Sequence, residues 1–166
     1  MSDSSGRVGR AFRDHDAFAD EPVDGAYEST STAFDAVVTA AERDDGRVAF
    51  DVTVTVPTLQ AVTAGDVADV VADGWYETFE RRVADIGAVT EADRDLSPST
   101  VRGDGDATVT AAFTDLDERR GVNDAAAVID YVGGTYVQGV IPGYDYEEPV
   151  SGLIDTARAA ANSDGI

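Results

Sequence analysis

Cysteine and lysine are both absent from this 166-residue chain, which has only one histidine and one tryptophan. Without cysteine there is no disulfide framework and no thiolate nucleophile. Without lysine there is no P-loop and no Schiff-base enzyme, and one histidine without cysteine cannot build a Cys/His zinc site. The patterns G-x-S-x-G and G-x-G-x-x-G are missing as well. These absences exclude several large enzyme classes, and we expect neither a cofactor nor a metal.

Long apolar runs are also missing. No run approaches the roughly 18 residues that indicate a membrane-spanning helix, and the N-terminal MSDSSGRVGR lacks the apolar centre of a signal peptide. We therefore expect a cytoplasmic protein that has no contact with a membrane.

Acidic side chains dominate the charge. There are 33 Asp and Glu residues against 12 basic ones, all arginine, and the formal net charge is −21. Such a surface repels itself in dilute buffer, whereas in molar salt the Debye length is only about 3 Å. Because 43% of the residues are apolar and fall in periodic runs, we expect a folded chain adapted to salt. A single domain over residues 1–166 is predicted, with frayed ends at 1–6 and 162–166.

Two stretches alternate apolar and polar side chains, as strands with one buried face do. The first is 47–56, which follows a second expected strand at 33–42 and the turn Asp44-Asp45-Gly46. The second is 107–113, which follows the turn Gly103-Asp104-Gly105. Both hairpins have a threonine-rich face, which we expect to meet water, with sheet-to-sheet dimerisation as the alternative.

Helical periodicity follows each hairpin. Residues 66–86 place an apolar stripe that includes Val70 and Trp75 opposite an acidic face, with Asp66 as N-cap. A second helix is predicted over 123–140. Shorter helices are predicted over 8–18 and 150–161.

The predicted fold class is α+β, an antiparallel sheet of four or five strands with helices packed on one face, in a loose ββα-ββα duplication. The N-terminal helix and a short strand near Tyr27 would make the order αβββαββα, which resembles the type III secretion chaperone fold. That resemblance implies a partner-binding dimer, although a fold alone does not establish a function.

The segment GTYVQGVIPGYDY, from Gly134 to Tyr146, carries a further resemblance. It is similar, as is the chain as a whole, to a small acidic haloarchaeal family of unknown function. The resemblance implies a salty cytoplasm and no particular activity.

Residues 131–146, YVGGTYVQGVIPGYDY, form the predicted contact surface. They include four of the six tyrosines and four glycines. A glycine inside a helix costs close to 1 kcal/mol relative to alanine, so its presence suggests close approach by a strand, a helix or a ligand. The candidate contact residues are Tyr131, Gly134, Thr135, Tyr136, Gln138, Tyr144 and Tyr146, with Trp75 and Tyr76 completing an aromatic groove. The alternative is a core helix packed on the sheet and followed by a surface turn.

Three functions remain open. The preferred one is a non-catalytic binding protein, a homodimer, that presents this surface to a protein partner or to itself. A small-molecule enzyme would use carboxylates with Tyr or Arg, for which the candidates are Asp130, Tyr131, Gln138, Tyr144 and Asp145. A nucleic-acid or nucleotide regulator would use the arginine clusters at 7–13, 81–82 and 119–120, which the net charge disfavours.

Other polar clusters favour ordinary structural roles. His15, between two aspartates, is expected to be exposed and inert rather than catalytic. Asp66, Asp69 and Asp73 share one helix flank, but an isolated flank lacks the ligand count that Ca²⁺ requires. We expect a solvated acidic face there.

Overall fold

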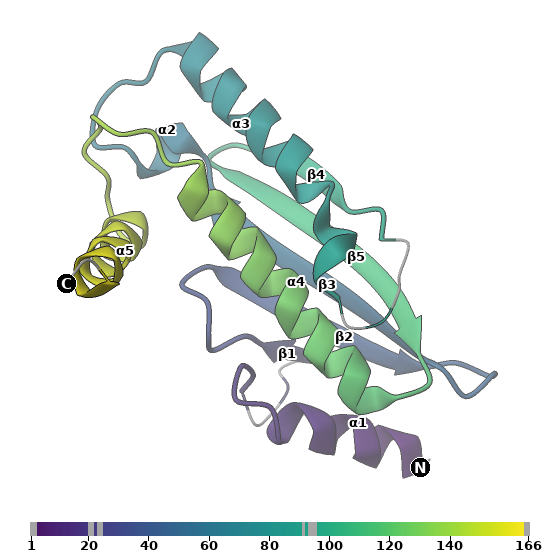
Figure 1. Cartoon of the computed structure of the whole chain (residues 1–166). Coiled ribbons are helices and arrows are strands. Elements are labelled where there is room, and N and C mark those ends of the chain that lie inside the picture. Colours follow the sequence, from purple (N-terminus) through teal and green to yellow (C-terminus); the bar gives the residue numbers. More distant parts are fainter. Residues whose placement is uncertain (1–2, 20–21, 23–24, 91, 93–95, 165–166) are drawn as a thin grey trace.

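The computed structural model describes residues 3–19, 22, 25–90, 92 and 96–164. Within them the chain forms a five-stranded antiparallel sheet with helices on one face (Figure 1). The strands are β1 (Ala26–Glu28), β2 (Asp35–Glu42), β3 (Val48–Pro57), β4 (Ser99–Arg102) and β5 (Asp106–Asp115), in the sheet order β1-β2-β3-β5-β4. The helices are α1 (Asp3–Arg13), α2 (Leu59–Val62), α3 (Asp69–Val83), α4 (Glu118–Gln138) and α5 (Val150–Asp164), with a 3₁₀ turn, η1, at Ile86–Val89.

This architecture confirms the predicted α+β class and both predicted hairpins. The turn Asp44-Asp45-Gly46 joins β2 to β3 in a register that pairs Val38 with Val52. Gly46 and Gly105 have φ angles of 84° and 90°, in the left-handed region that glycine adopts without strain. The elements follow the αβββαββα order that the sequence suggested, and the predicted C-terminal helix is present as α5; the short helix α2 was not predicted.

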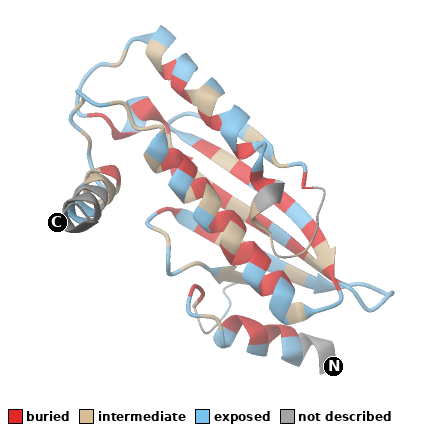
Figure 2. Cartoon of the chain, in the orientation of Figure 1, coloured by how far each residue is buried: buried red, intermediate tan, exposed pale blue. Residues whose placement is uncertain are grey.

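Alternation along the central strands separates a buried face from an open one (Figure 2). Phe50 and Val52 of β3 are buried, whereas Asp51 between them is exposed. Helix α4 crosses the buried face and comes closest at Gly121, where a Cβ atom would lie 2.2 Å from the Phe50 ring. Only glycine allows that approach, so this residue sets the height of α4 above the sheet.

Aromatic rings join α4 to α3 and to the segment before β2. The Tyr136 ring lies 4.8 Å from that of Phe34, 5.4 Å from that of Trp75 and 6.1 Å from that of Phe79, between centroids. Tyr136 is 1% exposed. It therefore belongs to the core and not to the contact surface predicted for it.

Helix α3 begins at Asp69, three residues later than predicted. The chain before it is tied to a distant loop, because the Ala64 amide donates to the Asp145 carbonyl (2.8 Å) and the Glu147 amide to the Val62 carbonyl (2.8 Å). Asp66 is therefore not the N-cap.

The buried stripe of α3 consists of Ala72, Trp75, Phe79 and Val83. The prediction of Trp75, Phe79 and Val83 on this stripe is confirmed. Val70, predicted to lie on it too, is 78% exposed, because Ala72 takes the buried position in that turn.

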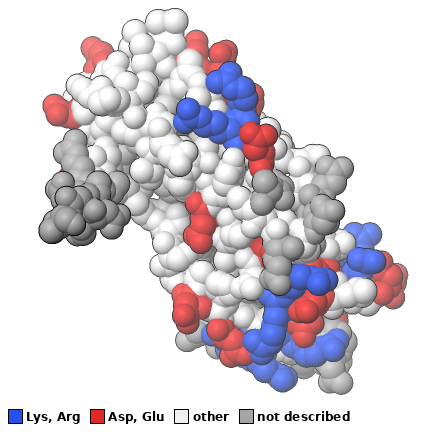
Figure 3. Space-filling view, in the orientation of Figure 1, with Lys and Arg blue, Asp and Glu red and all other residues white. Residues whose placement is uncertain are grey.

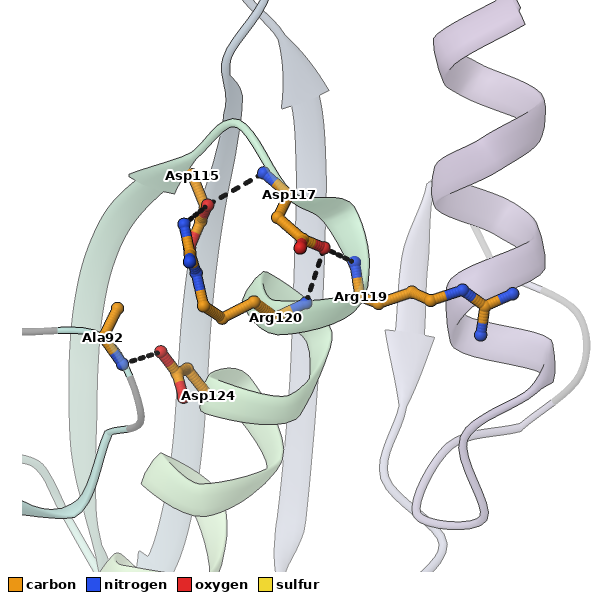
Figure 4. A network of polar contacts seen from close by, with 6 residues as sticks. All are labelled: Ala92, Asp115, Asp117, Arg119, Arg120 and Asp124. Carbon is orange, nitrogen blue, oxygen red and sulfur yellow. Dashed lines mark hydrogen bonds and ion pairs between the residues drawn. The ribbon is translucent and has the colours of Figure 1, made fainter.

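Helix α4 begins at Glu118, five residues before the predicted start. The Asp117 side chain accepts from the amides of Arg119 (3.0 Å) and Arg120 (3.1 Å), which caps the helix (Figure 4). Asp115, only 2% exposed, is held by the Arg120 guanidinium through two bonds of 2.7 and 2.8 Å. The residues just before the predicted start are thus the first turn of the helix.

The ends of the chain also differ from expectation. Helix α1 spans Asp3–Arg13 rather than 8–18, and α5 continues to Asp164, so much of the predicted fraying is helical. Residues 1–2 and 165–166 lie outside the described residues. In α1, Phe12 is buried and stacks on Tyr27 with 3.9 Å between centroids. The stacking docks α1 beside the edge strand.

His15 is half-buried and has a structural role in place of the exposed position expected. Its Nε2 lies 3.0 Å from the Asn123 side-chain oxygen, and its Nδ1 accepts from the Ala17 amide at 3.1 Å. These contacts connect the turn after α1 to α4. Across the described residues, no helix is both long enough and apolar enough to span a bilayer.

Candidate functional site

A groove follows the line along which α3 and α4 pack side by side, on the helical side of the sheet (Figure 1). It consists of two hollows of about 330 and 350 Å³ that share Arg82, Thr135 and Gln138. We name it the α3–α4 groove. It is lined by Val70, Val71, Gly74, Trp75, Thr78, Phe79, Arg82 and Asp85 on one side and by Tyr131, Gly134, Thr135, Gln138, Gly139 and Ile141 on the other.

Two almost fully buried polar side chains reach this groove without a hydrogen-bond partner. Trp75 and Thr135 are each 6% exposed, and neither the indole Nε1–H nor the threonine hydroxyl bonds to any described residue. Every side-chain nitrogen or oxygen sealed from solvent in the described chain has a partner. Because the Trp75 indole N–H and the Thr135 hydroxyl have no partner, neither atom can be sealed from solvent. Both side chains line the groove, so we infer that the two atoms open into it.

Glycines keep the groove open. A Cβ atom at Gly74 or Gly134 would meet nothing within 4 Å. A Cβ atom at Gly139 would lie 3.7 Å from the Trp75 Nε1 atom. Steric crowding explains why residue 121 is glycine, but it does not explain the glycines at positions 74 and 134. Gly74 and Gly134 nevertheless lower the stability of their helices, as glycine does relative to alanine.

One arginine lies where the two hollows meet, because Arg82 lines both of them. Arg82 and its neighbour Arg81 are exposed in the last turn of α3, and neither forms an ion pair with a described residue. Arg102 and Arg119, by contrast, each lie 2.7 Å from an aspartate, Asp73 and Asp14 respectively. The groove therefore presents a guanidinium that no described carboxylate engages.

The surface around the groove carries few charges on the face that Figure 3 shows. Much of the area over α3 and α4 is neither acidic nor basic, while blue arginine atoms gather over α3. Acidic side chains lie mostly at the two ends of this face. The helical face is therefore less charged than the composition of the chain would suggest.

The structure sorts the nine predicted contact residues into four places. Five line the α3–α4 groove: Tyr131, Gly134, Thr135, Gln138 and Trp75. Tyr136 is core. The Tyr76 hydroxyl lies 3.2 Å from both the Thr100 carbonyl and the Glu80 carboxylate, on the β4 side of α3. Burial, followed by the nearby Glu80 charge, raises the pKa of Tyr76.

Tyr144 and Tyr146 line a separate hollow of about 570 Å³ between the end of α4 and α5. The Tyr146 hydroxyl donates to the Ile141 carbonyl and accepts from the Ile141 amide, which fixes the loop. Burial raises the pKa of Tyr146. Its hydroxyl is fully engaged in the fold.

The enzyme candidates do not converge. Tyr131 and Gln138 share a hollow with the Asp85 carboxylate, but the Tyr131 hydroxyl donates to the Arg82 carbonyl at 2.7 Å. Tyr144 and Asp145 line the other hollow. Burial raises the pKa of Asp130, with the nearby His15 acting in the opposite direction, which places that carboxyl on the α1 side.

The remaining charged clusters hold the fold together. The network of Asp115, Asp117 and Arg120 joins β5 to α4 (Figure 4). Asp124 is 1% exposed and accepts from the Ala92 amide at 3.3 Å. In the part of the chain that the structure describes, no three His, Cys, Asp or Glu residues are placed to hold a metal ion.

Sequence reasoning found mainly the α4 side of the groove. Gly74 and Thr78 of α3 were not nominated, although Gly74 interrupts a strong helical pattern and was the available signal. Arg82 was nominated only within the arginine cluster 81–82.

Fold and groove together define a small α+β protein with an open groove between two helices and no convergent catalytic group among the described residues. The chain belongs to a family of unknown function, DUF5813, whose model matches residues 13–156. No curated protein matches the chain, and no solved structure matches it.

Proposed function

We propose that the chain is a non-catalytic protein-binding module and that the α3–α4 groove is its contact surface. The observation that carries the proposal is the open α3–α4 groove, into which the Trp75 indole N–H and the Thr135 hydroxyl open without a partner in the described chain. Both side chains are otherwise almost fully buried, and a tryptophan N–H with this mixture of apolar body and polar tip is typical of contact surfaces. A bound chain would supply acceptors to both.

The shape of the groove favours a polypeptide over a compact metabolite. Its two hollows are open and joined end to end rather than closed around one centre. Gly74 and Gly134 leave space into which a partner's backbone can move. A segment laid between two helices is a common mode of peptide recognition.

Three further features belong to this proposal. The charge of −21 supports work in a salt-rich cytoplasm. A homodimer is supported by the open sheet face, where Thr53 of β3 pairs with Thr110 of β5 in a flat polar surface. Sedimentation in molar salt, with Thr53→Arg as the variant that would disrupt such a dimer, tests it separately from the groove.

Site-specific photo-crosslinking tests the contact surface. A photoreactive amino acid at Gln138, in the groove, is compared with one at Thr53, on the opposite face. We expect specific cross-linked adducts from position 138 in cells that express the chain. Excess unlabelled protein should suppress those adducts.

The matched competitor is Gly134→Phe, which fills the groove where the helix has free space. It should compete poorly while keeping the fold. Equal adducts from positions 138 and 53, or full competition by Gly134→Phe, would contradict the proposal.

A further inference from the structure

The groove also indicates what kind of segment it receives. We infer that the partner is an acidic amphipathic segment of another protein, with a carboxylate against Arg82 or Arg81 and a neighbouring apolar side chain between α3 and α4. This inference rests on the proposed function and names the partner's chemistry.

Hydrogen-bond donors line the first hollow. The Trp75 indole N–H and the Arg82 guanidinium can only donate, and the Thr135 hydroxyl and Gln138 amide can donate as well. The acid that lines the groove, Asp85, belongs to the second hollow, which it shares with Arg82. A partner that satisfies these groups must bring oxygen acceptors, and a guanidinium binds carboxylates bidentately.

The first hollow also has an apolar part. Val71, Phe79 and Ile141 line it, and Val70 projects beside it with 78% of its surface exposed. An aliphatic or aromatic side chain can be buried there while a carboxylate one turn or two residues away reaches Arg82. Apolar anchors placed next to a charged rim are typical of binding hot spots.

The negative charge of the chain favours a peptide with a few carboxylates over a polyanion that binds through phosphates alone. The whole chain has a net charge of −21, so an approaching acid is repelled at long range, whereas within the groove Arg82 attracts it at short range. Salt screens the long-range repulsion more than it screens a short, partly buried contact. The affinity for an acidic segment should therefore rise, not fall, from dilute to moderate salt.

A displayed library of random peptides, selected on the folded chain in molar salt, tests the inference. Peptides that also bind Gly134→Phe are removed by counter-selection. We expect the survivors to carry an apolar residue next to Asp or Glu. A synthetic survivor is then titrated against the fluorescence of Trp75, the single tryptophan of the chain.

Charge variants give the decisive comparison. Arg82→Gln should weaken the synthetic peptide by about tenfold, the loss of one charge-assisted contact. Arg119→Gln, an exposed arginine paired with Asp14 outside the groove, should bind normally and controls for net charge. Replacing the peptide's carboxylates with amides should have the same effect as Arg82→Gln.

The possible failures are distinguishable. Survivors without acidic residues, or binding unchanged by Arg82→Gln, would overturn the acidic partner and leave a peptide-binding groove. A free dicarboxylate that shifts Trp75 fluorescence as the peptide does would assign the arginines to a small acid. A dimer lost in Gly134→Phe would make a second copy the occupant. No survivor at all would overturn the proposed function as well.

Discussion

Replacing a helical glycine with alanine is predicted to stabilise the fold at positions 74 and 134 and to destabilise it at position 121. At Gly74 and Gly134 a Cβ atom meets nothing within 4 Å, whereas at Gly121 it would lie 2.2 Å from the Phe50 ring. Alanine in an open helix position is worth about 0.8–1 kcal/mol over glycine. Gly74→Ala and Gly134→Ala should each raise the free energy of unfolding by close to that amount.

Gly121→Ala should instead lower the free energy of unfolding. The added methyl group overlaps a fully buried ring between α4 and β3, and overpacking of this kind typically costs about 1–3 kcal/mol. Helix propensity offsets only part of that cost.

Thermal and urea unfolding in molar salt measure all three variants. For a chain of this size, about 1 kcal/mol shifts the midpoint by roughly 2–4 °C. We expect upward shifts for positions 74 and 134 and a larger downward shift for 121. A loss of stability at Gly134 equal to that at Gly121 would refute the reasoning, because it would mean that the groove is closed in solution.

Three other variants or conditions give clear expectations. Arg120→Ala removes both guanidinium bonds to the buried Asp115 carboxylate and should cost about 2 kcal/mol of unfolding free energy, whereas Arg119→Ala loses an exposed ion pair and should cost less than about 1 kcal/mol. Urea titrations compare the two, and equal losses would argue against the buried pair. Burial raises the pKa of Tyr136, so its contribution is fully present below the unfolded value near 10 and is lost as the pH rises above it. Tyr136→Phe should reduce the alkaline loss of stability, and an unchanged profile between pH 9 and 11 would count against this cause. Lowering the salt from molar to dilute should decrease the thermal midpoint, because a charge of −21 is then unscreened, and a midpoint that rises in dilute buffer would contradict the adaptation to salt.

Local patterns predicted most of the fold. Alternating apolar and polar residues, together with a turn that contains Asp-Gly, are nearly sufficient to locate a strand. The ends of β3 and β5 were therefore predicted to within a residue or two. The exposure of Val70 was not predictable, because an apolar residue at the start of α3 fits the edge of the stripe and its burial depends on contacts from distant segments. The start of α4 depends on a cap and on a buried ion pair, both formed only in the folded chain.

The candidate site was predicted in part for the same reason. Helical spacing placed Trp75 and Gln138 on neighbouring faces, but only the fold shows that Tyr136 lies beneath the groove and that Tyr76 faces β4. Whether the Thr135 hydroxyl has a hydrogen-bond partner depends on which residues surround it in the folded chain. No sequence pattern predicts that.

The indole N–H resonance of Trp75 tests the central claim most directly. The chain has a single tryptophan, so one cross-peak in a ¹H–¹⁵N spectrum reports the free donor in the groove. On addition of a peptide selected on the folded chain, this peak should move downfield as it gains an acceptor, and the movement should disappear in Gly134→Phe. A peak that stays in place while amides of the open sheet face shift would contradict the account, because binding would then occur on the other side of the molecule.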